Sequence, residues 1–184
     1  MGAFIGRRTL GGHPNGKRKT ADLSRAKQRL TIVPFQRENQ AAAKALILAG
    51  MQEHWGVLDE SKNPDLDDIA AAYANGVFLV AWQNREIVGT GAFRPWSDDT
   101  VEIVRMSVKR ENRRQGIGRE ILAALCRAAY RQGYKRAVLE TTASWQDVIA
   151  FYQAFGFEIT HYASGDVYFA LNLEAFAARE QQGA

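Results

Sequence analysis

The chain reads VEIVRMSVKRENRRQGIGREILAALCRAA at residues 101–129, passing from a strand pattern through a glycine turn into a helix pattern. Thr100–Val108 is rich in β-branched residues in rough alternation, which predicts a strand. Apolar residues then recur at helical spacing, so we expect a helix over Gly116–Gln132 that ends at Gly133. The turn between them would bring unpaired backbone N–H groups, the positive end of a helix dipole and two arginines to one point. This stretch therefore predicts a phosphate-binding turn.

The same patterns organise the rest of the chain into alternating elements. Strands are expected at Leu30–Gln36, Val77–Gln83, Glu86–Phe93, Arg136–Thr142, Phe157–Tyr162 and Val167–Leu173, and helices at Asn39–His54, Asp65–Ala74 and Gln146–Phe155. Consecutive strands predict antiparallel pairing, whereas the strand–helix–strand unit over 100–142 predicts a parallel pair. The predicted fold class is α+β and sandwich-like, with a mixed, mostly antiparallel central sheet of about seven strands flanked by about four helices.

Composition limits the class of protein. A chain of 184 residues with 46% hydrophobic and 24% charged residues is typical of one globular domain. It has no apolar run long enough to cross a membrane and no signal-peptide pattern. The single cysteine, Cys126, lies on the apolar stripe of a predicted helix and argues against a disulfide or a cysteine-based metal site. We expect a cytoplasmic protein without a metal.

The basic charge is concentrated at the N-terminus. Residues 1–30 hold eight Lys and Arg against one Asp, which leaves 16 basic and 19 acidic residues for the remaining 154. Such a segment is expected to be disordered, and a solvated extension is favoured over an arm that contacts nucleic acid. A presequence for an organelle is a further, less favoured reading of this tail. The predicted organisation is a basic tail over 1–29, one domain over 30–173 and a C-terminal tail over 174–184.

Three kinds of phosphate loop could explain the turn. A nucleoside-triphosphate loop needs Lys and Ser or Thr after its last glycine, but Arg119 and Glu120 follow Gly118. A dinucleotide-binding loop needs a third glycine and a tight turn after the strand. Here the third glycine is replaced by Ile121, and seven residues separate the strand from Gly116, although Glu140 stands where an acid would be expected. Both of these readings are disfavoured.

The third kind of loop belongs to a known superfamily. Arg-x-x-Gly-x-Gly at 113–118, after a strand that ends Met-Ser-Val, resembles the coenzyme A loop of the GNAT N-acetyltransferases. The segments Val138–Thr141 and Phe151–Glu158, with its Tyr-x-x-x-Gly-Phe pattern, are similar to the family's corresponding strand and helix. The resemblance covers roughly residues 30–173 and is sharpest over 101–158. It implies a GNAT fold with acetyl-CoA as co-substrate, and because family members are often dimeric, a homodimer is one option.

The resemblance also implies a set of binding residues. The strand backbone would pair with the pantetheine arm, and the loop N–H groups would bind the pyrophosphate. Carried over position by position, the first group is Met106, Ser107 and Val108, and the second is Arg114, Gln115, Gly116, Ile117, Gly118 and Arg119, with Arg113 offering positive charge for the phosphates. Lys109 and Arg110 would add positive charge.

Two residues correspond to catalytic positions in the family. Tyr152 matches the frequent general acid that protonates the leaving thiolate, and its alternative role is aromatic packing beside Phe151 and Phe155. Glu102 matches a position where some members carry an acid, which would act as the base directly or through water; its alternative role is a salt bridge, with Arg105 for example. One departure from the family pattern is Trp145, which stands where many members carry an Asn that contacts coenzyme A.

The acceptor is expected to be an amine. Acceptor selectivity in this family comes from the first two helices and the closing strand pair, which here offer polar and aromatic side chains: His54, Trp55, Asp59, Glu60, Asp67, Asp68, His161 and Tyr162. The acidic residues would attract a cation. The predicted function is transfer of an acetyl group from acetyl-CoA to a primary amine of a small molecule or peptide by direct attack on the thioester. The alternative is a non-catalytic module that binds acyl-CoA, or nucleic acid through the basic tail.

Overall fold

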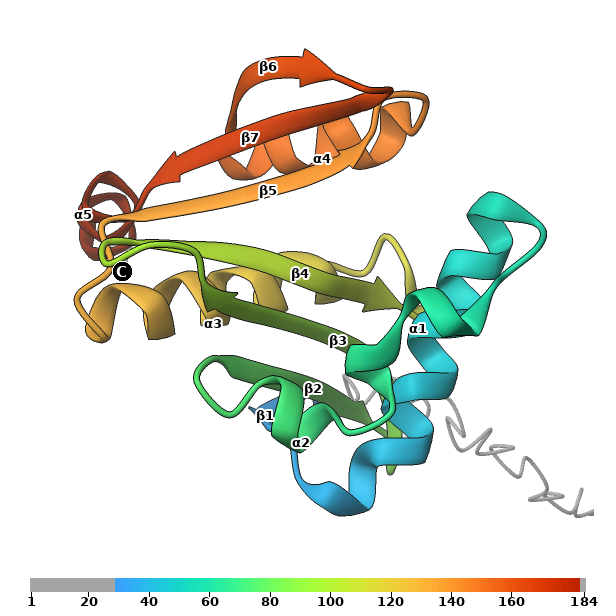
Figure 1. The fold of residues 1–184 in the computed structure, drawn as a ribbon. Helices are drawn as coiled ribbons and strands as arrows, with labels where there is room; N and C mark the ends of the chain where they lie inside the picture. Colours follow the sequence, from blue (N-terminus) through green and yellow to red (C-terminus); the bar gives the residue numbers. More distant parts are fainter. Residues whose placement is uncertain (1–28, 183–184) are drawn as a thin grey trace, which may run out of the picture.

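The structure, a computed structural model, describes residues 29–182 and is built on one seven-stranded sheet (Figure 1). The strands are β1 (Thr31–Pro34), β2 (Val77–Gln83), β3 (Glu86–Pro95), β4 (Thr100–Val108), β5 (Arg136–Thr142), β6 (Glu158–Ala163) and β7 (Asp166–Asn172). They lie in the order β1-β2-β3-β4-β5-β7-β6, and every neighbouring pair is antiparallel except β4 and β5. The mixed, mostly antiparallel sheet predicted from the sequence is therefore confirmed.

Helices cover the sheet on both faces. They are α1 (Gln40–Trp55), α2 (Ile69–Ala72), α3 (Ile117–Arg131), α4 (Gln146–Phe155) and α5 (Leu173–Gln182), with 3-10 turns η1 (Arg37–Asn39), η2 (Glu60–Lys62), η3 (Pro64–Leu66) and η4 (Arg110–Asn112). α3, α4 and α5 share one hydrophobic core, and α1 and α2 contribute to a second one under β2 and β3. None of the described helices is long and apolar enough to cross a bilayer.

The helix that follows the glycine turn owes its position to an apolar stripe. Ile121, Leu122, Leu125 and Cys126 of α3 are fully buried against the sheet. Burial of each large aliphatic side chain contributes roughly 1.5–3 kcal/mol, so the stripe fixes which side of α3 faces the strands. Burial also raises the pKa of the Cys126 thiol to about 12, as expected for a packing residue rather than a reactive one.

Two segments differ from the sequence-based expectation. The helix predicted over Asp65–Ala74 is split into η3 and the short α2, because the Asp68 side chain accepts a hydrogen bond from the Ala71 N–H and starts a new helix there. The C-terminal tail predicted over 174–184 is wrong for most of its length, since α5 packs Phe176 against Phe155 with ring centroids 5.6 Å apart. Almost all of the predicted N-terminal tail, residues 1–28, lies outside the described residues.

Candidate functional site

The parallel pair β4–β5 forms a fork. The two strands pair at only three positions, from Thr100↔Arg136 to Glu102↔Val138, and diverge beyond them (Figure 1). On its other side β4 stays paired with β3 as far as Val108. Beyond Glu102, one edge of β4 therefore has no strand partner among residues 29–182 and offers a row of N–H and C=O groups to an extended ligand.

A β-bulge lies on β4 inside this fork. The pairing of β3 with β4 shifts register between Thr90 and Ala92, and Arg105 has a positive φ of 55°. The Thr90 hydroxyl donates a hydrogen bond to the Arg105 carbonyl at 2.9 Å. A bulge adds a residue to one strand and bends it, so this one helps to turn the end of β4 away from β5.

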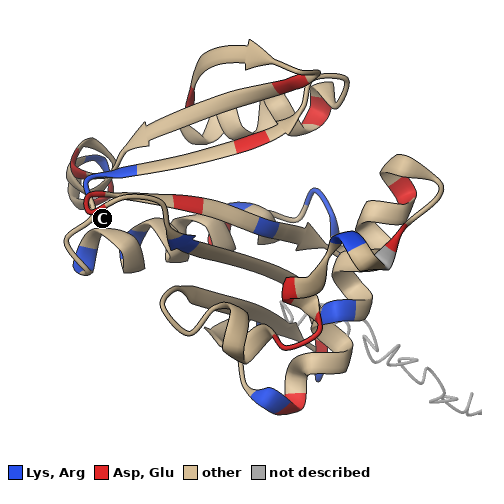
Figure 2. Cartoon of the chain, in the orientation of Figure 1, with Lys and Arg blue, Asp and Glu red and all other residues tan. Residues whose placement is uncertain are grey.

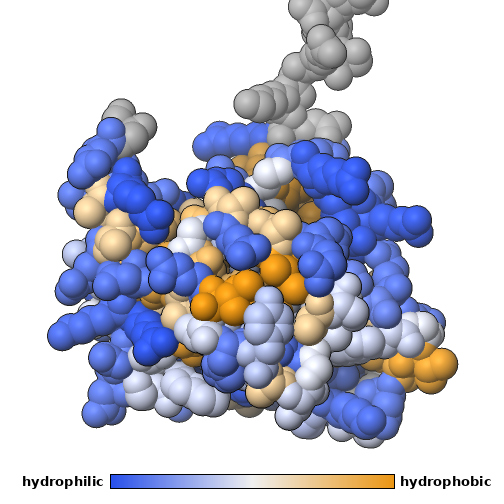
Figure 3. Space-filling view, turned by 90° about the horizontal axis from the view of Figure 1, so that it is seen from above, coloured by the Kyte–Doolittle hydropathy of each residue, from blue (hydrophilic) through white to orange (hydrophobic). Residues whose placement is uncertain are grey.

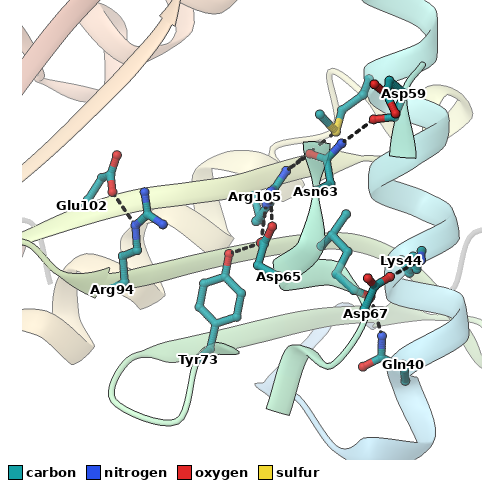
Figure 4. Close-up of polar contacts among 12 residues, drawn as sticks. Gln40, Lys44, Asp59, Asn63, Asp65, Asp67, Tyr73, Arg94, Glu102 and Arg105 are labelled. Carbon is teal, nitrogen blue, oxygen red and sulfur yellow. Dashed lines mark hydrogen bonds and ion pairs between the residues drawn. The ribbon is translucent and has the colours of Figure 1, made fainter. Parts of the chain in front are cut away.

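The Arg105 side chain anchors the segment before α2 over the bulge (Figure 4). Its guanidinium donates to both carboxylate oxygens of Asp65, at 2.8 Å for Nε, and to Asn63 Oδ1 at 2.9 Å. Tyr73 donates a further hydrogen bond to Asp65 at 2.8 Å. Burial raises the pKa of Asp65, but the bonds from Arg105 and Tyr73 outweigh burial and hold this pKa below its usual value. Arg105, named above as a possible partner in the alternative role of Glu102, thus pairs with Asp65, and Glu102 forms its salt bridge with Arg94.

The glycine turn opens α3 as the sequence predicted. Arg114 and Gly116 have positive φ values of 61° and 86°, and α3 begins at Ile117 without a side-chain cap. A Cβ built on Gly118 would find no atom closer than 3.5 Å, and one on Gly116 would find none within 4 Å. The start of α3 therefore has open space beside Gly116 at the positive end of a four-turn helix, which suits an anion.

The basic side chains around the turn have different partners. Arg113 donates to the Val108 carbonyl at 3.0 Å and pairs with Glu53 of α1 at 2.7 Å. Lys109 pairs with Glu86 and Glu111, both at 3.0 Å. Arg119 lies over the Phe155 ring, 5.3 Å from its centroid. Within residues 29–182, Arg110 and Arg114 make no hydrogen bond or ion pair through their side chains, so they are the cations still available there.

Tyr152 lies on α4, close to this turn. Its ring is 7% exposed and packs between Phe151, Phe157 and Phe169. The neighbouring Phe151 ring lies 3.5 Å from where a Cβ of Gly118 would stand, so α4 rests against the first turn of α3. The Tyr152 hydroxyl has no partner in the described part of the chain, where every fully buried side-chain oxygen has one, so this hydroxyl is accessible. Burial of the ring raises its pKa above the usual value.

Glu102 stands at the last paired position of the fork, on the other face of the sheet. Val101 and Ile103 pack in the core with Tyr152, and strand alternation turns Glu102 to the α1 side. Its Oε2 accepts a bond from Arg94 Nε at 2.6 Å, and by the same argument its unpartnered Oε1 is accessible. The two predicted catalytic residues therefore approach the fork from opposite faces.

Figure 2 shows acidic residues on β4, β5 and β7, on both sides of the fork, and basic ones on the loop that follows β4. The acids are Glu102, Glu140 and Asp166. The loop at the glycine turn is thus basic, whereas the fork strands carry these acids together with Arg105 on β4 and Arg136 on β5. Sequence reasoning considered Glu140 only as a dinucleotide ligand and passed over Asp65, Trp96 and Tyr168, because only the packing of loops and strands in the fold brings them to the site.

Trp145 precedes α4 and bridges to α1. Its ring stacks on His54 with centroids 4.1 Å apart, and Trp55 follows at 5.3 Å. Figure 3 shows a hydrophobic patch projecting on the side where Figure 1 places the end of α1, and Val57 of that segment is 88% exposed. The position that carries Asn in the resembling family is thus part of an aromatic contact here.

The remaining predicted acceptor residues do not gather at one point. Asp67 pairs with Lys44 at 2.8 Å, Asp68 caps α2, and Asp59 accepts bonds from Ser61. The Glu60 side chain lies outside the described part of the structure. His161 lines a cleft beside Glu102, whereas Tyr162 is 62% exposed on β6.

Comparison with known proteins agrees with this geometry. The profile of the acetyltransferase (GNAT) family matches residues 40–157. Over 103 residues, 52% of this chain, the sequence is 34% identical to a probable N-acetyltransferase family 8 member 5 of Mus musculus, covering 45% of that protein. It is 31% identical over 108 residues, 56% of this chain, to the uncharacterized N-acetyltransferase YjgM of Escherichia coli, covering 65% of it. The chain thus spans about half to two thirds of the length of these relatives.

Solved structures share the fold. A GNAT acetyltransferase of Staphylococcus aureus superposes with a TM-score of 0.73 at 22% identity, covering 79% of this chain and 99% of that one. A putative acetyltransferase of Salmonella typhimurium, solved with its cofactor acetyl-CoA, has a TM-score of 0.64 at 19% identity, covering 79% of this chain and 94% of that one. Together with the profile that spans both the fork and the glycine turn, these likenesses show that the chain belongs to the acetyltransferase (GNAT) family.

Proposed function

We propose that the protein transfers the acetyl group of acetyl-CoA to a primary amine of a small molecule or peptide. The observation that carries this proposal is the free edge of β4, which begins after Glu102 and leads directly into the glycine turn of α3. An extended ligand with a diphosphate at one end and amide groups along its arm would match both features. Solved relatives of this fold that contain coenzyme A or acetyl-CoA support the choice of donor.

The donor would lie along the fork. The backbone of Met106, Ser107 and Val108 would pair with the pantetheine amides. The amides of 114–119 would bind the pyrophosphate, with the open space at Gly116 and the missing side chain at Gly118 allowing its close approach. The side chains of Arg110 and Arg114 would supply positive charge, while Arg113 would hold α1 against the end of β4 through Glu53.

In this proposal the amine nitrogen attacks the thioester carbonyl from the Glu102 side. A C–N bond forms, the C–S bond breaks, one amine proton passes to Glu102 Oε1 directly or through water, and Tyr152 donates a proton to the departing sulfur. At ordinary pKa values a tyrosine is about 1.5 units less acidic than a thiol, which costs about 2 kcal/mol. Burial raises the pKa of Tyr152, so its hydroxyl would first stabilise the negative charge that develops on the sulfur through a hydrogen bond, and the proton would pass along that bond as the C–S bond breaks.

The test is release of free thiol from acetyl-CoA with a panel of primary amines, repeated with Tyr152→Phe. Tyr130→Phe, on the exposed side of α3, is the matched control. The proposal expects thiol release with at least one amine, a loss of roughly 10²-fold or more in kcat for Tyr152→Phe, and little change for the control. Tight coenzyme A binding without thiol release for any amine would favour the non-catalytic module instead.

A further inference from the structure

An open cleft of about 180 Å³ begins at Glu102 and runs over β5 and β7 on the α1 side of the sheet. No helix of the described chain covers this part of the sheet, because α1 and α2 pack on β2, β3 and the later part of β4 instead. The polar and aromatic side chains that line the cleft include those of Trp96, Glu102, Arg136, Glu140, His161 and Tyr168.

Tyr168 forms an aromatic wall of the cleft. The His161 ring stacks on it with centroids 4.4 Å apart and planes at 3°. The Thr160 hydroxyl donates to the Tyr168 carbonyl at 3.1 Å and lies 3.0 Å from His161 Nδ1, which fixes the imidazole. In the sheet, β6 lies on one side of β7 and β5 lies on the other. His161, on β6, therefore covers the outer face of the Tyr168 ring, which is the face turned away from β5. The inner face, which is turned toward β5 and the fork, stays uncovered by His161.

Glu140 provides the charge beside this face. It stands opposite Tyr168 in the β5–β7 ladder, and the nearby carboxylate raises the pKa of that tyrosine. A carboxylate next to an open aromatic face binds a cation through both charge and the ring quadrupole. Glu140 is exposed, so its carboxylate is available.

The positive residue of the cleft lies at the opposite end. Arg136 precedes Glu140 by four residues on β5, about 13 Å along a strand. Because Glu102 is level with Val138, Arg136 lies on the side away from the fork opening, and Glu140 lies on the side toward it. The fork end of the cleft is therefore acidic and aromatic.

We infer that this cleft binds a second cationic group of the acceptor, held by Glu140 and the inner face of Tyr168, while the acceptor's reactive amine lies at the fork beside Glu102. The inference rests on the proposed function and names its substrate class: an amine that carries another cation. Glu140 lies one strand across from Glu102 and two residues further along, which puts their Cα positions roughly 8 Å apart, so the two nitrogens should lie roughly 6–10 Å apart. Flexible aliphatic diamines of about four to six carbons span that distance.

The experiment compares n-butylamine with 1,4-diaminobutane and its longer homologues in thiol release. The wild-type protein should give a kcat/KM at least tenfold higher for the best diamine than for n-butylamine. Glu140→Gln should remove most of that advantage through KM while leaving the values for n-butylamine within about twofold. Tyr168→Leu should reduce it as well, and Glu174→Gln, the same charge change on α5, should preserve it.

Equal kcat/KM for n-butylamine and every diamine, or an unchanged diamine preference in Glu140→Gln, would overturn the inference without affecting acetyl transfer itself. If no amine releases thiol, calorimetry of 1,4-diaminobutane binding to the coenzyme A complex tests the cation site independently of acetyl transfer. Binding that weakens at least fivefold in Glu140→Gln would support the cation site, and absence of binding to the wild-type protein would refute it.

Discussion

Trp145, just before α4, stacks on His54 near the end of α1, with ring centroids 4.1 Å apart and planes at 26°. The first residue follows β5 and the second belongs to the helix that packs on β3 and β4. The contact therefore joins the two walls of the fork at its open end, where Figure 1 places the end of α1 and the start of α4. At the position where the family pattern has an Asn that contacts coenzyme A, this chain has Trp145, whose ring contacts α1 instead.

Removal of this contact should weaken the binding of acetyl-CoA more than it lowers the stability of the fold. We expect Trp145→Ala to lower the free energy of unfolding by about 1 kcal/mol, since an aromatic pair contributes roughly 0.5–1.5 kcal/mol. The Michaelis constant for acetyl-CoA should rise severalfold because the end of α1 is no longer held at the fork. Steady-state kinetics and urea unfolding measure the two effects, with Tyr130→Ala as control; a stability loss with an unchanged Michaelis constant would contradict the account.

The Asp65–Arg105 pair should be the most stabilising ion pair of the α1–α2 segment. We expect Asp65→Asn to cost about 2–3 kcal/mol in urea unfolding, because it leaves the largely buried Arg105 guanidinium without a charged partner. Asp67→Asn is the matched control, since Asp67 pairs with Lys44 at an exposed position and should cost less than about 1 kcal/mol. Equal losses for the two variants would show that the Asp65 pair has no special role.

The same pair predicts a pH dependence. The pKa of Asp65 is lowered in the folded protein, so its ionised form contributes stability above the unfolded value of about 3.9, and this contribution is lost as pH falls through the lower folded value. The stability difference between the wild-type protein and Asp65→Asn should therefore be constant from pH 7 to about 5 and shrink below about 4. Chemical unfolding across this range measures it; a difference that grows on acidification would have the wrong sign.

Gly118→Ala should separate binding from folding. The added methyl group meets nothing closer than 3.5 Å in the folded protein, so the melting temperature should change little. The same methyl group would stand between Phe151 and Val108 in the first turn of α3, beside the proposed pyrophosphate site, and we expect the dissociation constant of coenzyme A to rise at least tenfold. Calorimetry measures this constant, and Ala128→Gly on the same helix is the control for helix propensity. An unchanged affinity for coenzyme A would argue against a pyrophosphate site at the start of α3.

Strong local patterns made much of the fold predictable. The strands Val77–Gln83, Thr100–Val108 and Arg136–Thr142 and the helix Gln146–Phe155 have the predicted bounds, because alternation or helical periodicity is bounded there by clear turn residues. The hairpin turn at Asn84 and Arg85 has two positive φ values, as a two-residue turn between antiparallel strands requires. The helix over 173–182 was missed because its few apolar residues become informative only once Phe155 is seen to face them.

The site was less predictable for a physical reason. The glycine turn is local, so its sequence was enough to place it at the start of α3. The fork depends on how far β5 follows β4, and the Asp65–Arg105 pair joins residues 40 positions apart. The same holds for Glu140 and Tyr168, which strand register places side by side. Contacts of this kind follow from tertiary packing, which a single sequence does not display.

The central claim is that the fork and the glycine turn bind acetyl-CoA so that its acetyl group reaches an amine. The most direct test is incubation with acetyl-CoA carrying an isotope label in the acetyl group, together with 1,4-diaminobutane and simple primary amines, followed by mass spectrometry of the amines and titration of free thiol. The account predicts labelled amide and free thiol in equal amounts. Thiol release without labelled amide, or bound coenzyme A with neither product, would contradict it.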